Sequence, residues 1–109
     1  MFKEANIIMA PNADPQQHRA KIKGDQFEYN TVVIPIFNFD KAAQVCKELV
    51  EKEGVQSINL CPGFSHEGVA KIRSVLGEGV TINVSRGDAP STMMTAQILA
   101  KEGWLPAGH

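Results

Sequence analysis

The sequence predicts one α/β domain, built on a small, mostly parallel four-stranded sheet flanked by helices, as in a Rossmann-like or flavodoxin-like sandwich. Apolar, β-branched runs alternate with segments of helical periodicity, so that a strand is followed by a helix four times along the chain. The length of 109 residues suits a single core. A hydrophobic content of 43% with 21% charged residues is typical of globular chains and not of disordered ones.

The first predicted strand covers residues 5–9, because the apolar run Ala-Asn-Ile-Ile-Met ends at a proline-containing turn. A short helix is expected next. Asp14 is a suitable N-cap, Pro15 fits the first helical position, and Gln17 can complete a capping box. We expect this helix to end before Gly24.

The second strand is predicted over residues 27–37, which are rich in β-branched and aromatic side chains. A helix should follow, with Asn38 as its N-cap and Gly54 as the left-handed residue that ends it. Val55 is expected to contact Val50 in a Schellman ending. The predicted helix has one apolar stripe on a 3.6-residue period, formed by Ala42, Cys46, Leu49 and Val50.

The third strand and its helix follow the same pattern, with the strand at residues 55–60. The helix begins after Phe64 and ends near Gly77. Its spacing places Val69, Ile72 and Leu76 on the buried side.

The last strand is predicted over residues 80–84, and Pro90 with Ser91 opens the last helix. Gly103 should end this helix, and Trp104 should fold back on it. We expect three of its apolar side chains to point inward: Met94, Ile98 and Leu99.

Charge and hydropathy exclude some classes of partner. The formal net charge is −1, with eleven basic residues scattered among twelve acidic ones, so we predict no nucleic-acid binding. The sequence contains no run of about 20 apolar residues and no signal-peptide h-region, so we predict no membrane association and a cytoplasmic location. In that reducing compartment Cys46 and Cys61 would remain thiols.

Candidate site residues gather where the predicted parallel strands end, because ligands of open parallel sheets bind beyond the carboxyl ends of the strands. The segment after the third strand is the densest. Gly63 allows close approach of the backbone, and the first helical turn favours a carboxylate or phosphate. His66 is the candidate proton shuttle and catalytic residue. The predicted ligand-binding residues are Gly63, Phe64, Ser65, Arg86, Asp88 and Asp14.

Each of these residues also has a purely structural interpretation. Gly63 and Ser65 are typical of strand-to-helix turns, and Arg86 with Asp88 can form a surface ion pair instead of a carboxylate clamp. Cys61 near His66 can be a nucleophile with its base, but a small buried side chain is the stronger interpretation. No dinucleotide fingerprint, phosphate loop or close metal-ligand pair occurs, so we predict no cofactor and no metal.

The chain resembles a family of small prokaryotic α/β proteins of unknown function. Three segments carry the resemblance: residues 10–15, 51–55 and, most specifically, 60–70, where family members look like Leu-Cys-Gly-Gly-Phe-Gly-His-Glu-Gly. The similarity covers roughly residues 2–86. This chain has Pro62 and Ser65 in place of two glycines, which stiffens the loop. The resemblance supports the fold and draws attention to His66, and it implies no reaction.

Two functions remain open from the sequence. In the first, the domain binds or acts on a small anionic metabolite at the carboxyl edge of the sheet. In the second, it is a non-catalytic homo-oligomeric or partner-binding module, because we expect a short chain with 43% hydrophobic residues to leave some of them uncovered when it is alone. The contact surface of that module would be formed by Met93, Met94, Trp104 and Leu105.

Overall fold

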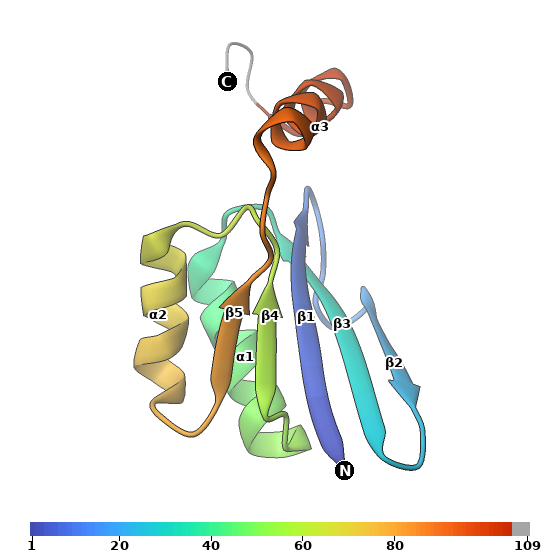
Figure 1. Ribbon diagram of the computed structural model, residues 1–109, viewed down its shortest axis with the longest axis vertical. Coiled ribbons are helices and arrows are strands. Elements are labelled where there is room, and N and C mark those ends of the chain that lie inside the picture. The colour runs from blue at the N-terminus through green and yellow to red at the C-terminus, as the bar shows by residue number, and fades with distance from the viewer. Residues whose placement is uncertain (106–109) are drawn as a thin grey trace.

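The computed structural model describes residues 1–105, which form one five-stranded sheet and three helices (Figure 1). The helices are α1 (Phe39–Glu53), α2 (His66–Leu76) and α3 (Ala89–Lys101). The α/β class and the mostly parallel sheet are confirmed, but the sheet has five strands where the sequence predicted four. The strands are β1 (Phe2–Ala10), β2 (Arg19–Lys23), β3 (Phe27–Pro35), β4 (Ser57–Leu60) and β5 (Thr81–Val84).

The additional strand, β2, replaces the helix that was predicted from Asp14 onward. The Asp14 carbonyl does accept hydrogen bonds from the backbone N–H groups of Gln17 and His18, at 3.0 and 2.7 Å, but this one turn does not continue. Residues 19–23 then alternate polar and apolar side chains with the period of a strand, and they pair antiparallel with β3. The predicted helix is therefore wrong, because the two-residue period prevails over the capping signal.

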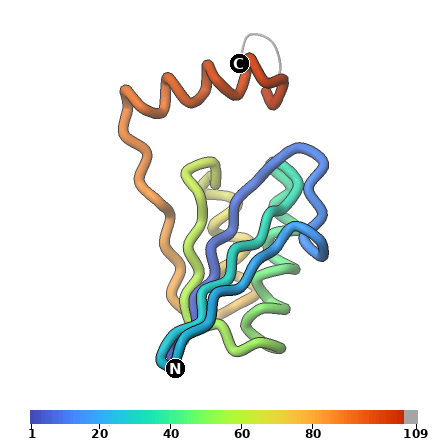
Figure 2. The backbone as a smooth tube through the Cα atoms, turned by 90° about the vertical axis from the view of Figure 1, so that its right-hand side faces the viewer, coloured from blue at the N-terminus to red at the C-terminus, as the bar shows by residue number. Residues whose placement is uncertain are grey.

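The strand order β2-β3-β1-β4-β5 explains why both packed helices lie on one face of the sheet. Helix α1 connects β3 to β4 and α2 connects β4 to β5, so both right-handed crossovers move in the same direction along the sheet. The connection from β1 to β3 runs along the sheet in the direction opposite to these two crossovers. A helix in this connection would cover the other face of the sheet, but the chain forms the edge strand β2 instead. Figure 2 shows α1 and α2 on one side of the strands. The other side, the open face, has no packed helix from the described residues.

The core lies between the sheet and these two helices. Alternate residues of β1 and β3 point into it, so that Ala5, Ile7, Val32 and Ile34 are almost fully buried. The apolar stripe predicted for α1 is on the buried side. Its buried members include Ala42, Cys46 and Leu49, and Ile72 of α2 completes the layer.

Helix α1 begins and ends as the sequence predicts. The Asn38 side chain accepts a hydrogen bond from the Lys41 N–H at 3.0 Å, and Gly54 adopts a φ of 75°. The Gly54 N–H then donates to the Val50 carbonyl at 3.2 Å, and the Val55 N–H donates to the Leu49 carbonyl at 3.1 Å. The left-handed ending is therefore as predicted, but its bonds reach one residue further back than those of the expected Schellman ending. Local capping signals therefore fix both ends of this helix.

Helix α3 lies beyond the carboxyl ends of the strands and is joined to β5 by residues 85–88 (Figure 1). Its ending is as predicted, since Gly103 has a φ of 79° and the Trp104 N–H donates to the Leu99 carbonyl. The predicted inward orientation is wrong for two residues, because Met94 is 63% exposed and Ile98 is 51% exposed. No residue of α3 is buried.

A cluster of charged side chains ties the edge strand β2 to the rest of the fold. Lys21 Nζ lies 3.1 Å from Glu53 Oε1 and 3.9 Å from the buried carboxylate of Glu28. Asn30 Nδ2 also donates to Glu28 at 3.3 Å. This hydrogen bond, together with the charge of Lys21 and against the effect of burial, lowers the pKa of Glu28 below its ordinary value of 4.5. The charged form of Glu28 is therefore the one that the fold stabilises.

We predict that Glu28→Gln reduces the acid sensitivity of the fold. Because the pKa of Glu28 is lower in the folded protein than in the unfolded chain, its stabilisation is present above pH 4.5 and is lost as the pH falls through the folded value. Urea unfolding at about pH 6 and about pH 3 should show a smaller loss of unfolding free energy in the variant. Glu78→Gln, which changes an exposed carboxylate, should keep the wild-type loss. Equal losses in all three proteins would contradict the prediction.

Candidate functional site

A cavity of about 650 Å³ lies at the carboxyl edge of the sheet, between the strand ends and α3. Its position is the one that open parallel sheets use for ligands. Its volume lies within the range of roughly 300–1,000 Å³ that is usual for small-molecule sites. The lining residues are Met9, Ile36, Phe37, Cys61, Pro62, Gly63, Arg86, Gly87, Asp88, Ser91, Thr92, Thr95, Ala96, Leu99, Trp104 and Leu105.

The floor of the cavity is built from the ends of β1, β3 and β4. Strand β3 ends at Pro35, two residues earlier than predicted, and the chain turns at Phe37 with a φ of 57°. The Phe37 N–H donates to the Met9 sulfur at 3.2 Å, which holds this turn against β1. A Cβ atom on Gly63 would lie 2.7 Å from the end of the Met9 side chain. Glycine at this position therefore keeps the cavity floor open without displacing Met9.

Arg86 supplies positive charge at the cavity wall. Its Nε donates to Asp88 Oδ1 at 2.6 Å, which orients the guanidinium group. Among the described residues its Nη groups have no hydrogen-bond or ion-pair partner. The pair thus combines the two interpretations of the sequence: it is a surface ion pair, and it leaves guanidinium donors free for a carboxylate or phosphate.

The two cysteines have the properties of structural thiols. Burial raises the pKa of Cys46 to about 12. Burial also raises the pKa of Cys61, which is half-buried in the cavity wall, although backbone hydrogen bonds oppose the effect. Both groups are therefore thiols near neutral pH, whereas a cysteine nucleophile requires the thiolate. The burial and the raised pKa of Cys61 therefore favour a role as a lining residue over a role as a nucleophile.

The structure brings three of the predicted site residues together at the cavity: Gly63, Arg86 and Asp88. The other four do not line it. His66 is the first residue of α2 and is exposed, and its side chain makes no hydrogen bond or ion pair with the described residues.

The remaining three have local roles. Asp14 Oδ1 accepts from the Gln16 N–H at 2.9 Å, and Ser65 caps α2 by accepting from the Gly68 N–H at 3.1 Å. Phe64 is buried, with its ring centroid 5.4 Å from that of Phe39.

Reasoning from the sequence missed the contribution of α3 to the cavity. The helix presents Thr92, Thr95 and Leu99 to the strand ends, and Trp104 and Leu105 follow it. The signal is in the sequence, because small and hydroxyl side chains recur at positions 91, 92, 95 and 96, which share one side of a helix. Such a side is too polar for a core contact and suits the wall of a solvated cavity.

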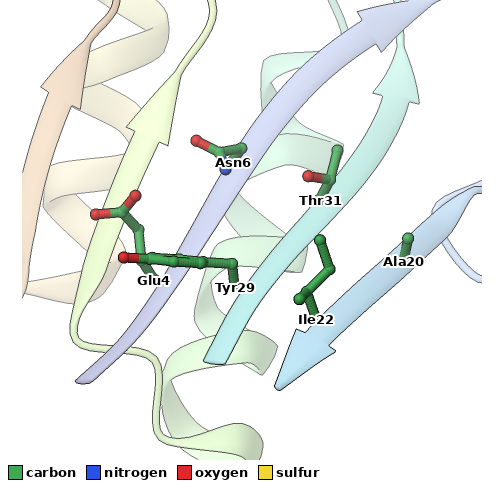
Figure 3. A pocket seen from close by; sticks show the side chains of 6 residues that line it. All are labelled: Glu4, Asn6, Ala20, Ile22, Tyr29 and Thr31. Atoms are coloured by element: carbon green, nitrogen blue, oxygen red, sulfur yellow. The ribbon is translucent and has the colours of Figure 1, made fainter. Parts of the chain in front are cut away.

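A second, smaller hollow of about 320 Å³ lies on the open face of the sheet (Figure 3). Side chains from β1, β2 and β3 line it, and the Tyr29 ring extends across β1 toward Glu4 (Figure 3). The carboxylate of Glu4 accepts a hydrogen bond from Asn59 Nδ2 at 2.8 Å. The lining residues are Glu4, Asn6, Ala20, Ile22, Tyr29 and Thr31.

Residues 1–105 contain neither a group of side chains placed to hold a metal ion nor a membrane-spanning helix. No group of three or more His, Cys, Asp and Glu side chains is placed to hold a metal ion there. No helix within this part of the chain is both long enough and apolar enough to cross a membrane.

Comparison with known proteins gives a family and no activity. No curated protein and no solved structure matches the chain. A family model described as a family of unknown function, DUF6506, matches residues 2–100, so the match extends beyond β5 and includes nearly all of α3. The chain therefore belongs to the DUF6506 family.

Proposed function

We propose that the domain binds a small molecule with an apolar body and one carboxylate or phosphate group, in the cavity between the sheet edge and α3. The observation that supports this most directly is the composition of the cavity wall. Apolar side chains predominate, and a single cationic side chain, Arg86, lies among the described lining residues. Sites for small molecules commonly combine an apolar wall with few polar groups that fix the orientation of the ligand.

Each part of the wall has a role in this proposal. The free Nη groups of Arg86 bind the anionic group, and the hydroxyl groups of Thr92 and Thr95 supply further hydrogen bonds. Trp104 and Leu105 contact the apolar body of the ligand. No reaction is part of the proposal, and His66 has no role in it because it lies outside the wall.

The proposal predicts that an acid binds more tightly than its matching amide. Trp104 is the one tryptophan of the chain and lines the cavity, so its fluorescence reports binding directly. In a panel of carboxylic acids, their amides and alkyl phosphates, we expect an anionic hit to raise the melting temperature and to change Trp104 emission. Arg86→Gln should weaken this hit by about 10- to 100-fold, because a charge-assisted hydrogen bond is lost.

Matched controls separate the cavity from general effects. Lys47→Gln removes one positive charge from the exposed side of α1 and should leave the affinity unchanged. Ala96→Phe fills the cavity and should abolish binding, whereas Ala70→Phe on the exposed side of α2 should not. A hit that binds Arg86→Gln and Ala96→Phe as tightly as the wild type would show that this cavity is not the site.

A further inference from the structure

Helix α3 turns its more polar side toward its own domain. The residues that line the cavity from α3 are mostly small or hydroxylated, as described above. Three larger apolar side chains point away instead, with Met93 67% exposed, Met94 63% exposed and Ile98 51% exposed. A helix that folds only onto its own domain has the opposite arrangement. The outer side of α3 therefore has the composition of a contact surface without a partner in the same copy.

The open face of the sheet lacks a partner as well. Sheets with mainly parallel strands are usually covered on both faces. Here Ile22 is 67% exposed, and three aromatic rings group at one end of the face. The ring centroids of Phe27 and Tyr29 are 5.4 Å apart, and those of Phe2 and Tyr29 are 6.4 Å apart.

The two surfaces match in charge. Lys101 is the single charged residue of α3. On the open face, strand alternation leaves Glu4 as the single charged side chain among the described strands. Exposed surfaces usually have about a quarter to a third charged residues, whereas the centres of protein interfaces are depleted of them. The charge that remains on α3, at Lys101, is opposite in sign to the charge that remains on the open face, at Glu4.

We propose that two copies of the chain form a two-fold dimer, in which the outer side of α3 of each protomer covers the open face of its partner. Within one copy the two surfaces do not meet, because α3 crosses the carboxyl edge of the sheet (Figure 2). Its outer side is opposite the side that lines the cavity and is exposed. A helix of 13 residues is about 20 Å long and fits on strands of nine residues, about 30 Å long.

This dimer contains two identical contacts, each between one α3 and one sheet. The inner side of α3 still forms the wall of its own cavity, so the dimer does not depend on what the cavity binds. A foreign protein on either surface, or α3 folded onto its own sheet, would leave the isolated chain monomeric.

Sedimentation of the full chain and of single variants tests the proposal. The wild type should be a dimer at micromolar concentrations. Ile22→Lys on the sheet and Met94→Lys on α3 should each raise the dimer dissociation constant by about 30-fold or more, because a charge enters the contact. Both side chains are exposed, so the variants should keep the wild-type circular dichroism. Val75→Lys is the control, since Val75 is 43% exposed on α2 and lies outside both surfaces.

Mixing the two monomeric variants distinguishes a reciprocal dimer from other dimers. Ile22→Lys retains an intact α3, and Met94→Lys retains an intact sheet, so the mixture should form a heterodimer with one intact contact. A monomeric wild type would overturn the proposal. A dimer that survives Ile22→Lys, or a mixture that stays monomeric, would also overturn it, because both results indicate contacts that do not pair α3 with the sheet.

Discussion

Replacement of Ile7 by alanine is expected to lower the free energy of unfolding by about 3–4 kcal/mol, which is the typical cost of truncating a large aliphatic side chain in a core. Ile7 is fully buried, at 0% exposure, on the central strand β1. The loss combines the transfer free energy of the removed methyl groups with that of the cavity they leave. Urea unfolding followed by circular dichroism measures it.

The neighbouring residue provides a matched control for this experiment. Ile8 has the same side chain on the same strand, but it points to the open face and is 39% exposed. The comparison is made in the Met94→Lys background, in which we expect no second copy to cover Ile8. There Ile8→Ala should lower the free energy of unfolding by less than about 1 kcal/mol. Equal losses at the two positions in that background would show that both faces of the sheet are buried within one copy, contrary to the structure.

Truncation of the chain after Gly87 is expected to separate folding from binding. It removes α3, which has no buried residue, so the free energy of unfolding should stay within about 1 kcal/mol of that of the Met94→Lys monomer. It also removes one wall of the cavity and the helix that we assign to the dimer contact. The truncated chain should therefore show neither a ligand-induced rise in melting temperature nor self-association.

Circular dichroism is the suitable probe for this chain, because Trp104 is lost with α3. Stopping the chain at Lys101 instead gives a milder control, which keeps α3 but removes Trp104 and Leu105 from the cavity wall. This control should dimerise and should bind the ligand more weakly. If the chain that ends at Gly87 were unfolded, α3 would be part of the cooperative core. That result would contradict the exposure of its residues in the structure.

Local signals predicted the central part of the fold well, and they failed where two signals compete. Asn38 and Gly54 fixed α1 because each cap needs only neighbouring residues. At Asp14 an equally good capping signal gave a single turn, since Ala20 and Ile22 alternate with lysines and pair with β3. The alternation of residues 19–23 is visible in the sequence. Their pairing with β3 depends on the tertiary structure, which the local sequence does not show.

Only some of the predicted site residues lie at the cavity, for a similar reason. Topology places Gly63 and Arg86 at the same edge, because parallel strands all end there. The sequence allowed Ser65 and Asp14 either a capping role or a ligand-binding role, and only the turn geometry shows that their side chains accept hydrogen bonds from their own turns. Amphipathic spacing in α3 was interpreted as contact with the core of the same copy, although periodicity alone does not identify which surface a helix meets.

The central position of β1 has a consequence for biosynthesis. The strand precedes both of its partners in the sequence, residues 27–35 on one side and 57–60 on the other, so both ladders wait for later segments. Its buried side is covered only after α1 has left the ribosome. An apolar Ile-Ile-Met segment therefore stays unprotected while about half of the chain is translated, and it is open to non-native contacts during that time.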